Sequence, residues 1–161
     1  TGDAPLRMIS SYMVQFIIAE AELMLNADVV ASEAAFIKGM EAAFSEVEGL
    51  PGVPGIMQDD IDDYIAERVL DFQNAADDEA RLDLVITQKY LANFGNGIEA
   101  YNDFRRTGYP SYPDISQIQD PLGEGVFPRR LPYDNDEFQG PNPPDENILL
   151  QTPVFWDNNI Q

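Results

Sequence analysis

The helical spacing of apolar residues over about the first two-thirds of the chain constrains the fold most strongly. From Met8 to Asn26, apolar side chains recur at the intervals that form one face of an α-helix. The same spacing returns over about residues 32–48, and Gly49 supplies a C-terminal stop. Two helices joined by a connection as short as "ADVVAS" must run antiparallel, so this part predicts a helical hairpin.

A second pair of helices is predicted after the turn-forming segment "LPGVPG". The segment "DDIDDYIAERVLDF" restarts the helical spacing, with two aspartates where a helix N-terminus favours negative charge. The stretch from Leu82 to Tyr90 marks a fourth helix that ends near Gly95. A short fifth helix holds Ile98 to Arg105 and stops before Gly108. Two successive hairpins suggest a tetratricopeptide-like pair, although no consensus repeat is legible.

The last third of the chain has a different character. Nine of the twelve prolines lie between Pro110 and Pro153, and no helical or alternating period runs through them. Many aromatic residues accompany these prolines, and so much aromatic surface needs somewhere to pack. We therefore expect a mainly α protein with two regions: helical hairpins over residues 1–108, and a long irregular Pro- and aromatic-rich segment, residues 109–161, wrapped on them.

Composition excludes several classes of function. The 161 residues include 29 acidic and 9 basic side chains, a formal charge of −20, and such a surface repels nucleic acid and anionic lipid. The chain contains no His, the usual general base and zinc ligand, and no Cys, so it has no thiol nucleophile or disulfide. We predict no cofactor and no metal. The simplest explanation of the negative charge is that it keeps the protein soluble.

The start of the chain shows no targeting signal. It reads "TGDAPLRM", without an initiator Met, a charged leader or an apolar leader segment, and the apolar run "MVQFIIAEAELML" is too short and too polar to span a bilayer. Either a targeting segment has been removed or the chain is a piece of something longer. The residues alone leave both possibilities open.

Two local patterns could carry chemistry, and each has a simpler explanation. Glu99 and Asp103 lie one helical turn apart, as a glycosidase pair could, but a solvated helix face explains them better. The segment "DNDEFQG" suggests a calcium loop, yet Phe138 and Gln139 stand where an oxygen ligand and a glycine are needed. We interpret it as an Asx-type turn.

The cationic residues are concentrated in two dipeptides. Arg105–Arg106 and Arg129–Arg130 together hold four of the nine positive charges. They could bind phosphate or nucleic acid, bind carboxylates, or act as a structural clamp. The acidic surface argues against a polyanion, whereas guanidinium groups bond carboxylates and unpaired carbonyls and stack on aromatic rings. We therefore predict an arginine clamp, formed by these four arginines with Glu20 as an acidic partner, that fastens the irregular segment.

The same residues carry a family resemblance. The stretches "KYLANFGNGIEAYNDFRRTGYPS", "FPRRLPYDNDEF" and "PVFWD", with the opening "APLRMISSYMVQFIIAEAEL", resemble the C-terminal region of the SusD/RagB family. The match falls on the two arginine pairs and on the following residues: Pro5, Arg7, Phe16, Ala19, Glu20, Ala21, Glu99, Ala100, Tyr101, Asp103, Phe104, Thr107, Gly108, Tyr109, Pro110, Pro132 and Tyr133.

The resemblance implies binding and no catalysis. Members of this family are nutrient-binding outer-membrane lipoproteins of Bacteroidetes, which sit on the cell surface. The resemblance implies that this chain is a piece of a longer protein, with its lipid anchor on a segment that this sequence lacks. They capture a glycan or peptide for a TonB-dependent, SusC-like transporter. Aromatic side chains form flat platforms for sugar rings, and the candidates here are Tyr109, Tyr112, Phe127 and Trp156. Packing of the C-terminal segment is the favoured explanation for each of them. The alternative function is a helical-repeat scaffold that binds only proteins.

Overall fold

The computed structural model describes residues 9–50, 52–111, 128–131, 133–143 and 150–157. Contacts divide the chain into two compact units, Thr1–Tyr101 and Asn102–Gln161, and the boundary falls inside a helix.

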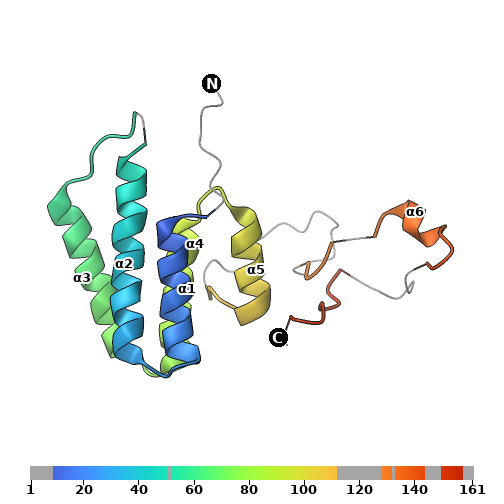
Figure 1. Ribbon diagram of the computed structural model, residues 1–161, viewed down its shortest axis with the longest axis horizontal. Helices are drawn as coiled ribbons and strands as arrows, with labels where there is room; N and C mark the ends of the chain where they lie inside the picture. Colours follow the sequence, from blue (N-terminus) through green and yellow to red (C-terminus); the bar gives the residue numbers. More distant parts are fainter. Residues whose placement is uncertain (1–8, 51, 112–127, 132, 144–149, 158–161) are drawn as a thin grey trace. The chain divides into compact units, whose positions relative to one another are not determined.

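The described residues form helices and no strands, which confirms the prediction of a mainly α fold. Figure 1 labels the helices α1 to α6 in the order of the sequence, and α6 is a short helix near its C-terminal end. Their bounds are α1 Ser11–Met24, α2 Val29–Glu48, α3 Gln58–Asn74, α4 Asp78–Ala92, α5 Gly97–Thr107 and α6 Asn135–Phe138.

Side-chain caps set two of the helix starts. The carboxylate of Asp28 accepts a hydrogen bond from the backbone N of Ala31 at 2.9 Å, and that of Asp77 accepts one from Ala80 at 2.9 Å. Such a cap satisfies one of the backbone donors that every helix start leaves open. Because of the Asp28 cap, α2 begins at Val29 and not near residue 32, so the connection from α1 is shorter than predicted.

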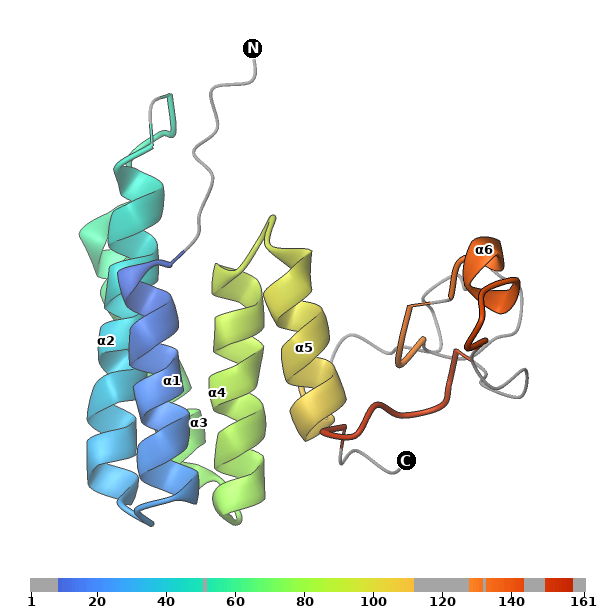
Figure 2. The same ribbon diagram turned by 45° about the vertical axis from the view of Figure 1, so that its right-hand side comes forward.

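Helices α1 to α4 form an antiparallel bundle in the first unit. Successive helices alternate in direction, and α1 lies beside both α2 and α4 in the two ribbon views (Figures 1 and 2). Helix α2 also packs against α3, and α3 against α4. The two hairpins therefore close against each other, and their likeness to tetratricopeptide repeats stays a prediction.

A chain of buried aromatic rings crosses the bundle. Phe36 of α2 meets Phe16 of α1 edge to face, with ring centroids 6.3 Å apart, and stacks on Phe72 of α3 at 5.4 Å. None of the three rings is more than 1% exposed. Offset and edge-to-face pairs of this kind add to the hydrophobic gain of burial. The rest of this core cluster consists of Tyr12, Met13, Ala19, Ala35, Met40 and Val85.

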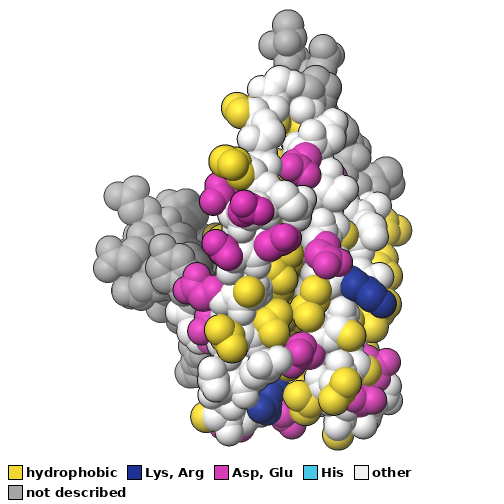
Figure 3. Space-filling model, turned by 90° about the vertical axis from the view of Figure 1, so that its left-hand side faces the viewer, with side chains coloured by type: hydrophobic (Ala, Val, Ile, Leu, Met, Phe, Trp, Pro, Cys, Tyr) yellow, Lys and Arg dark blue, Asp and Glu magenta, His cyan; other side chains and the backbone are white. Residues whose placement is uncertain are grey.

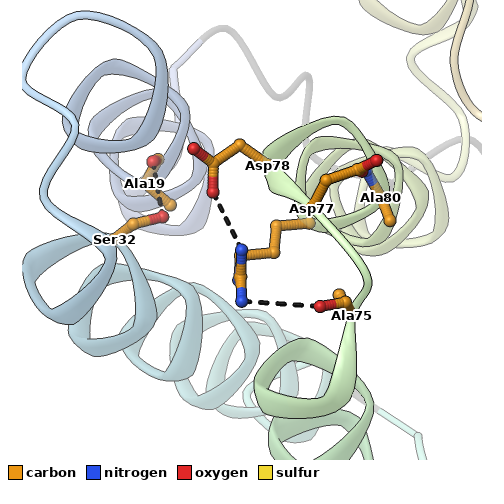
Figure 4. Close-up of polar contacts among 7 residues, drawn as sticks. Ala19, Ser32, Ala75, Asp77, Asp78 and Ala80 are labelled. Atoms are coloured by element: carbon orange, nitrogen blue, oxygen red, sulfur yellow. Dashed lines mark hydrogen bonds and ion pairs between the residues drawn. The ribbon is translucent and has the colours of Figure 1, made fainter.

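Polar contacts fasten the helices near the α1–α2 and α3–α4 turns (Figure 4). The hydroxyl of fully buried Ser32 donates to the backbone O of Ala19 at 2.8 Å, which ties α2 to α1. At the start of α4, the guanidinium of Arg81 donates to Asp78 at 2.9 Å and to the backbone O of Ala75 at 3.5 Å. The first of these bonds satisfies a hydroxyl that burial would otherwise leave unpaired.

Gly39 makes the close contact of α1 and α2 possible. A Cβ at this position would lie 2.8 Å from Cε1 of Phe16 and 3.0 Å from two further ring atoms. The glycine thus lies inside a helix, where it is intrinsically unfavourable, because the buried ring occupies the space of a side chain.

We predict that Gly39→Ala destabilises the protein by roughly 1–3 kcal/mol, since the strain of overpacking outweighs the gain in helix propensity. Urea unfolding followed by far-UV circular dichroism measures the change. Gly49→Ala is the matched control, because its φ is −71° and its Cβ would meet only ordinary contacts of 3.5 Å. An equal or higher midpoint for Gly39→Ala would contradict the close-packing argument.

Candidate functional site

The first arginine pair lies at the end of α5, as predicted. Arg105 and Arg106 occupy the last turn of the helix, where positive charge is favourable. Gly108 follows with a φ of +81°, and its N donates to the backbone O of Phe104 at 2.8 Å. A glycine in the left-handed conformation is the common way to end a helix, so the stop before Gly108 is confirmed.

Arg105 joins three parts of the second unit. Its Nη1 donates to the backbone O of Arg129 at 2.8 Å, and its Nη2 donates to the side chain of Asn102 at 2.8 Å. The guanidinium carbon lies 4.4 Å from the ring centroid of Trp156. A planar cation at this distance over an indole gains a cation–π attraction. Arg105 thus meets both the segment of the second arginine pair and the segment near the C-terminus.

Arg106 pairs with a buried carboxylate on its own helix. Its Nη2 donates to Oδ1 of Asp103 at 3.1 Å. Asp103 is only 5% exposed, so the interpretation of Asp103 as part of a solvated face is wrong. A buried carboxylate needs a partner, and the spacing of three residues along a helix places Arg106 within reach. Asp103 acts here as a structural anion.

Arg129 forms a largely buried ion pair with Asp157. Its Nε donates to Oδ2 of Asp157 at 2.7 Å, and its Nη2 donates to Oδ1, so the pair is bidentate. The side chain of Asp157 is 0% exposed, and that of Arg129 is 17% exposed. The hydrogen bond to Asp157 raises the pKa of Arg129 above its ordinary value, so the guanidinium stays charged.

The backbone around the second pair is satisfied by one carbonyl. The backbone N of Arg129 and that of Arg130 both donate to the O of Leu150, at 2.8 and 3.2 Å. The guanidinium of Arg130 lies 5.4 Å from the ring centroid of Tyr133 and donates to its hydroxyl at 3.3 Å. These bonds satisfy polar groups in a proline-rich segment, where the prolines lack the backbone N–H that regular strand pairing would use.

The segment "DNDEFQG" is an Asx turn that opens α6. Asp134 precedes the helix, and its carboxylate accepts a hydrogen bond from the N of Asp136 at 3.4 Å. This confirms the sequence interpretation of the segment. Among the residues that the structure describes, no group of acidic side chains could hold a metal ion.

The four aromatic candidates for ligand contact are only partly described. Tyr112 and Phe127 lie outside the described residues. Trp156 is half-buried beneath Arg105, and Tyr109 is half-buried in the turn after α5. Glu20 is half-buried on α1, and its partnership with the arginines stays a prediction, as does ligand contact by Tyr109 and Trp156.

Sequence reasoning did not identify Asp157 or Asp103 as partners of the arginines. Asp103 could have been found, because it lies three residues before Arg106 on a predicted helix. Asp157 lies 28 residues from Arg129, so no local spacing connects them. The signal available was its position in the closing motif "PVFWD".

A second feature is an apolar pocket in the first unit. It lies between α2, α3 and α4 and has a volume of about 160 Å³. Tyr64 and Gln88 supply its polar edge, and the hydroxyl of Tyr64 donates to Oε1 of Gln88 at 2.9 Å. The remaining lining residues are Met40, Ala43, Phe44, Val47, Leu91 and Ala92.

The described residues thus form a helical protein in which arginines of the second unit contact a backbone carbonyl, an indole ring and a buried carboxylate. The model of the SusD-like family, described as SusD and RagB outer membrane lipoprotein, matches residues 3–151. The chain therefore belongs to the SusD-like family, whose members are outer-membrane nutrient-binding lipoproteins. No curated protein and no solved structure matches the chain. None of the helices in the described ranges is long and apolar enough to cross a membrane.

We predict that Arg129→Met lowers the free energy of unfolding of the second unit by about 3 kcal/mol or more, because it leaves the Asp157 carboxylate buried without its partner. Trp156 is the only tryptophan of the chain, so its fluorescence during urea unfolding reports on this unit. Arg130→Met is the matched control and should cost roughly 1 kcal/mol or less, the value of an exposed cation–π contact. Equal losses for the two variants would refute the special role of Arg129.

We also predict that Arg105→Ala shifts the emission of Trp156 in the folded protein, because the ring loses the cation that covers it. Arg106→Ala should leave the emission unchanged, since Arg106 bonds Asp103. Steady-state fluorescence at equal concentration compares the two variants with the parent. An unchanged spectrum for Arg105→Ala would show that the stacking contact does not persist in solution.

Proposed function

We propose that this chain is part of a surface protein that binds a nutrient, most readily a glycan, and delivers it to a TonB-dependent, SusC-like transporter of the outer membrane. The observation that carries the proposal is the family match over residues 3–151. A lipid anchor on a segment outside this sequence would hold the protein at the cell surface.

The contacts of the arginines support a structural role for the clamp in such a protein. Arg129 uses both Nε and Nη2 on Asp157, and Arg105 uses Nη1 and Nη2 on Arg129 and Asn102. A phosphate or carboxylate ligand would have to displace these bonds, and breaking a buried pair is costly. The ligand therefore binds elsewhere, on aromatic surface, with Tyr109, Tyr112, Phe127 and Trp156 as the candidates in this chain.

Binding, and not catalysis, is the chemistry that we propose. The carboxylate of Asp103, one half of the candidate catalytic pair, is bonded to Arg106. A carboxylate that is 5% exposed and bonded to a cation on its own helix is poorly placed to reach a substrate. The alternative to ligand binding is a helical scaffold that contacts a transporter or another protein without any affinity for a nutrient.

The test is a pull-down of the tagged full-length protein from detergent-solubilised outer membranes. We expect a large β-barrel transporter to co-purify, and we expect the purified protein to bind members of a glycan panel saturably and without divalent metal. Recovery of the protein alone, where a known transporter pair survives the same detergent, would refute delivery to a transporter. Co-purification without binding to any glycan or peptide would favour the scaffold.

A further inference from the structure

The pocket between α2, α3 and α4 has the size of one side chain. An engineered cavity of about 150 Å³ binds a single benzene ring. The present volume of about 160 Å³ therefore suits one aromatic ring or one branched aliphatic group, and not a sugar oligomer or a larger cofactor. Its wall is mostly aliphatic, apart from Tyr64, Phe44 and Gln88.

Gln88 presents an unused donor at this wall. The residue is 7% exposed, and its Oε1 accepts the hydroxyl hydrogen of Tyr64. Within the described parts of the chain, the structure shows no acceptor for its Nε2. Tyr64 is fixed in turn by an edge-to-face contact with Phe44, with ring centroids 5.6 Å apart. An amide donor at the wall of an apolar pocket can bond a carbonyl oxygen, so an occupant that carries a carbonyl group is favoured.

Acidic residues predominate on the helices around the pocket. The guanidinium of Arg68 lies 5.6 Å from the ring centroid of Tyr64, but Glu67 and Asp71 pair with it. Helices α2 and α3 carry ten acidic and two basic residues between them. Glu41 and Glu48 lie one helical turn from Phe44, and Asp60 lies one turn from Tyr64, so all three project beside lining residues. The last turn of α2 contains no basic residue to balance its carbonyl end.

Apolar and acidic side chains also occur together on the surface of this part of the protein. Figure 3 shows the side of the molecule on which α3 lies, where apolar side chains are exposed between acidic ones and Lys or Arg side chains are sparse. Exposed apolar residues on α3 and before it include Met57, 68% exposed, and Leu70, 57% exposed. Apolar surface rimmed by polar groups is typical of an interaction site.

We propose that this pocket is a docking site for a polypeptide that inserts one Leu- or Phe-sized side chain and carries Lys or Arg on either side of it. The side chain fills the apolar volume, a backbone carbonyl accepts from Gln88 Nε2, and the cations face Glu41, Glu48 and Asp60. A free hydrocarbon ligand would use only the first of these features, which is why a polypeptide fits better. The proposal does not depend on nutrient binding.

The test uses the whole 161-residue chain and three fluorescein-labelled peptides. One is Lys-rich with a single central Leu, the second has Ala in place of that Leu, and the third has Glu in place of every Lys. Fluorescence anisotropy should show saturable binding of the first, weakened by about tenfold or more in each of the others, which corresponds to about 1.4 kcal/mol. Rising salt should weaken the binding of the first peptide.

Two variant pairs locate the site. Leu91→Ser removes part of the pocket wall at a residue that is 51% exposed, and Val14→Ser on α1, 42% exposed, is its control. Glu48→Lys with Asp60→Lys reverses the rim charge, and Asp136→Lys with Glu137→Lys on α6 makes the same change in charge elsewhere. The first member of each pair should lose binding of the Lys-rich peptide, and each control should keep it. All four residues of the charge variants are exposed, so the fold should persist, which circular dichroism checks.

Three outcomes would overturn the proposal. One is equal binding of the Lys-rich and Glu-rich peptides. Another is equal loss of binding in both charge variants, which would show attraction by net charge alone. The third is binding of free indole that depends on Leu91 while the peptides show no such dependence, which would make the pocket a small-molecule site.

Discussion

The contact of Phe36 with Phe16 and Phe72 is the interaction on which the bundle depends. One ring of α2 touches a ring of α1 and a ring of α3, and all three are excluded from water. Gly39 allows α1 to approach closely enough for the first of these contacts. The position of α2 relative to its neighbours follows from these contacts, and with it the pocket that α2 shares with α3 and α4.

The second unit satisfies its polar groups in a different way from the helical bundle. Its prolines cannot donate backbone hydrogen bonds, and its described residues include only the last part of α5 and the short α6 as regular structure. Arginine side chains supply hydrogen bonds between segments that regular backbone pairing would otherwise supply. Arg105 bonds a backbone carbonyl, and Arg129 bonds the buried carboxylate of Asp157. These contacts within the protein support a structural role for the arginines, which is the role that we propose for them.

Periodicity predicted the helices well because each helix has one buried face. The helix ends were less predictable, since α2 starts at Val29 through a cap that the apolar pattern does not contain. Among the candidate site residues, the arginines were recognised as a group, but their acidic partners were not. The ion pair of Arg129 with Asp157 closes a long irregular segment, and only the path of the backbone brings its members together. The pocket was also missed, because its lining residues come from three helices and each looks like an ordinary core position.

By itself, the sequence determined the helical class of the protein, the Asx turn before α6, the stop at Gly108 and the family to which the chain belongs. These features depend on residues close together in the chain or on motifs read in order, so spacing alone specifies them. The tertiary structure decided that Asp103 is buried, that Asp157 pairs with Arg129, and that Gln88 lines an apolar pocket. Burial and pairing across helices depend on distances in space, which the order of residues does not contain.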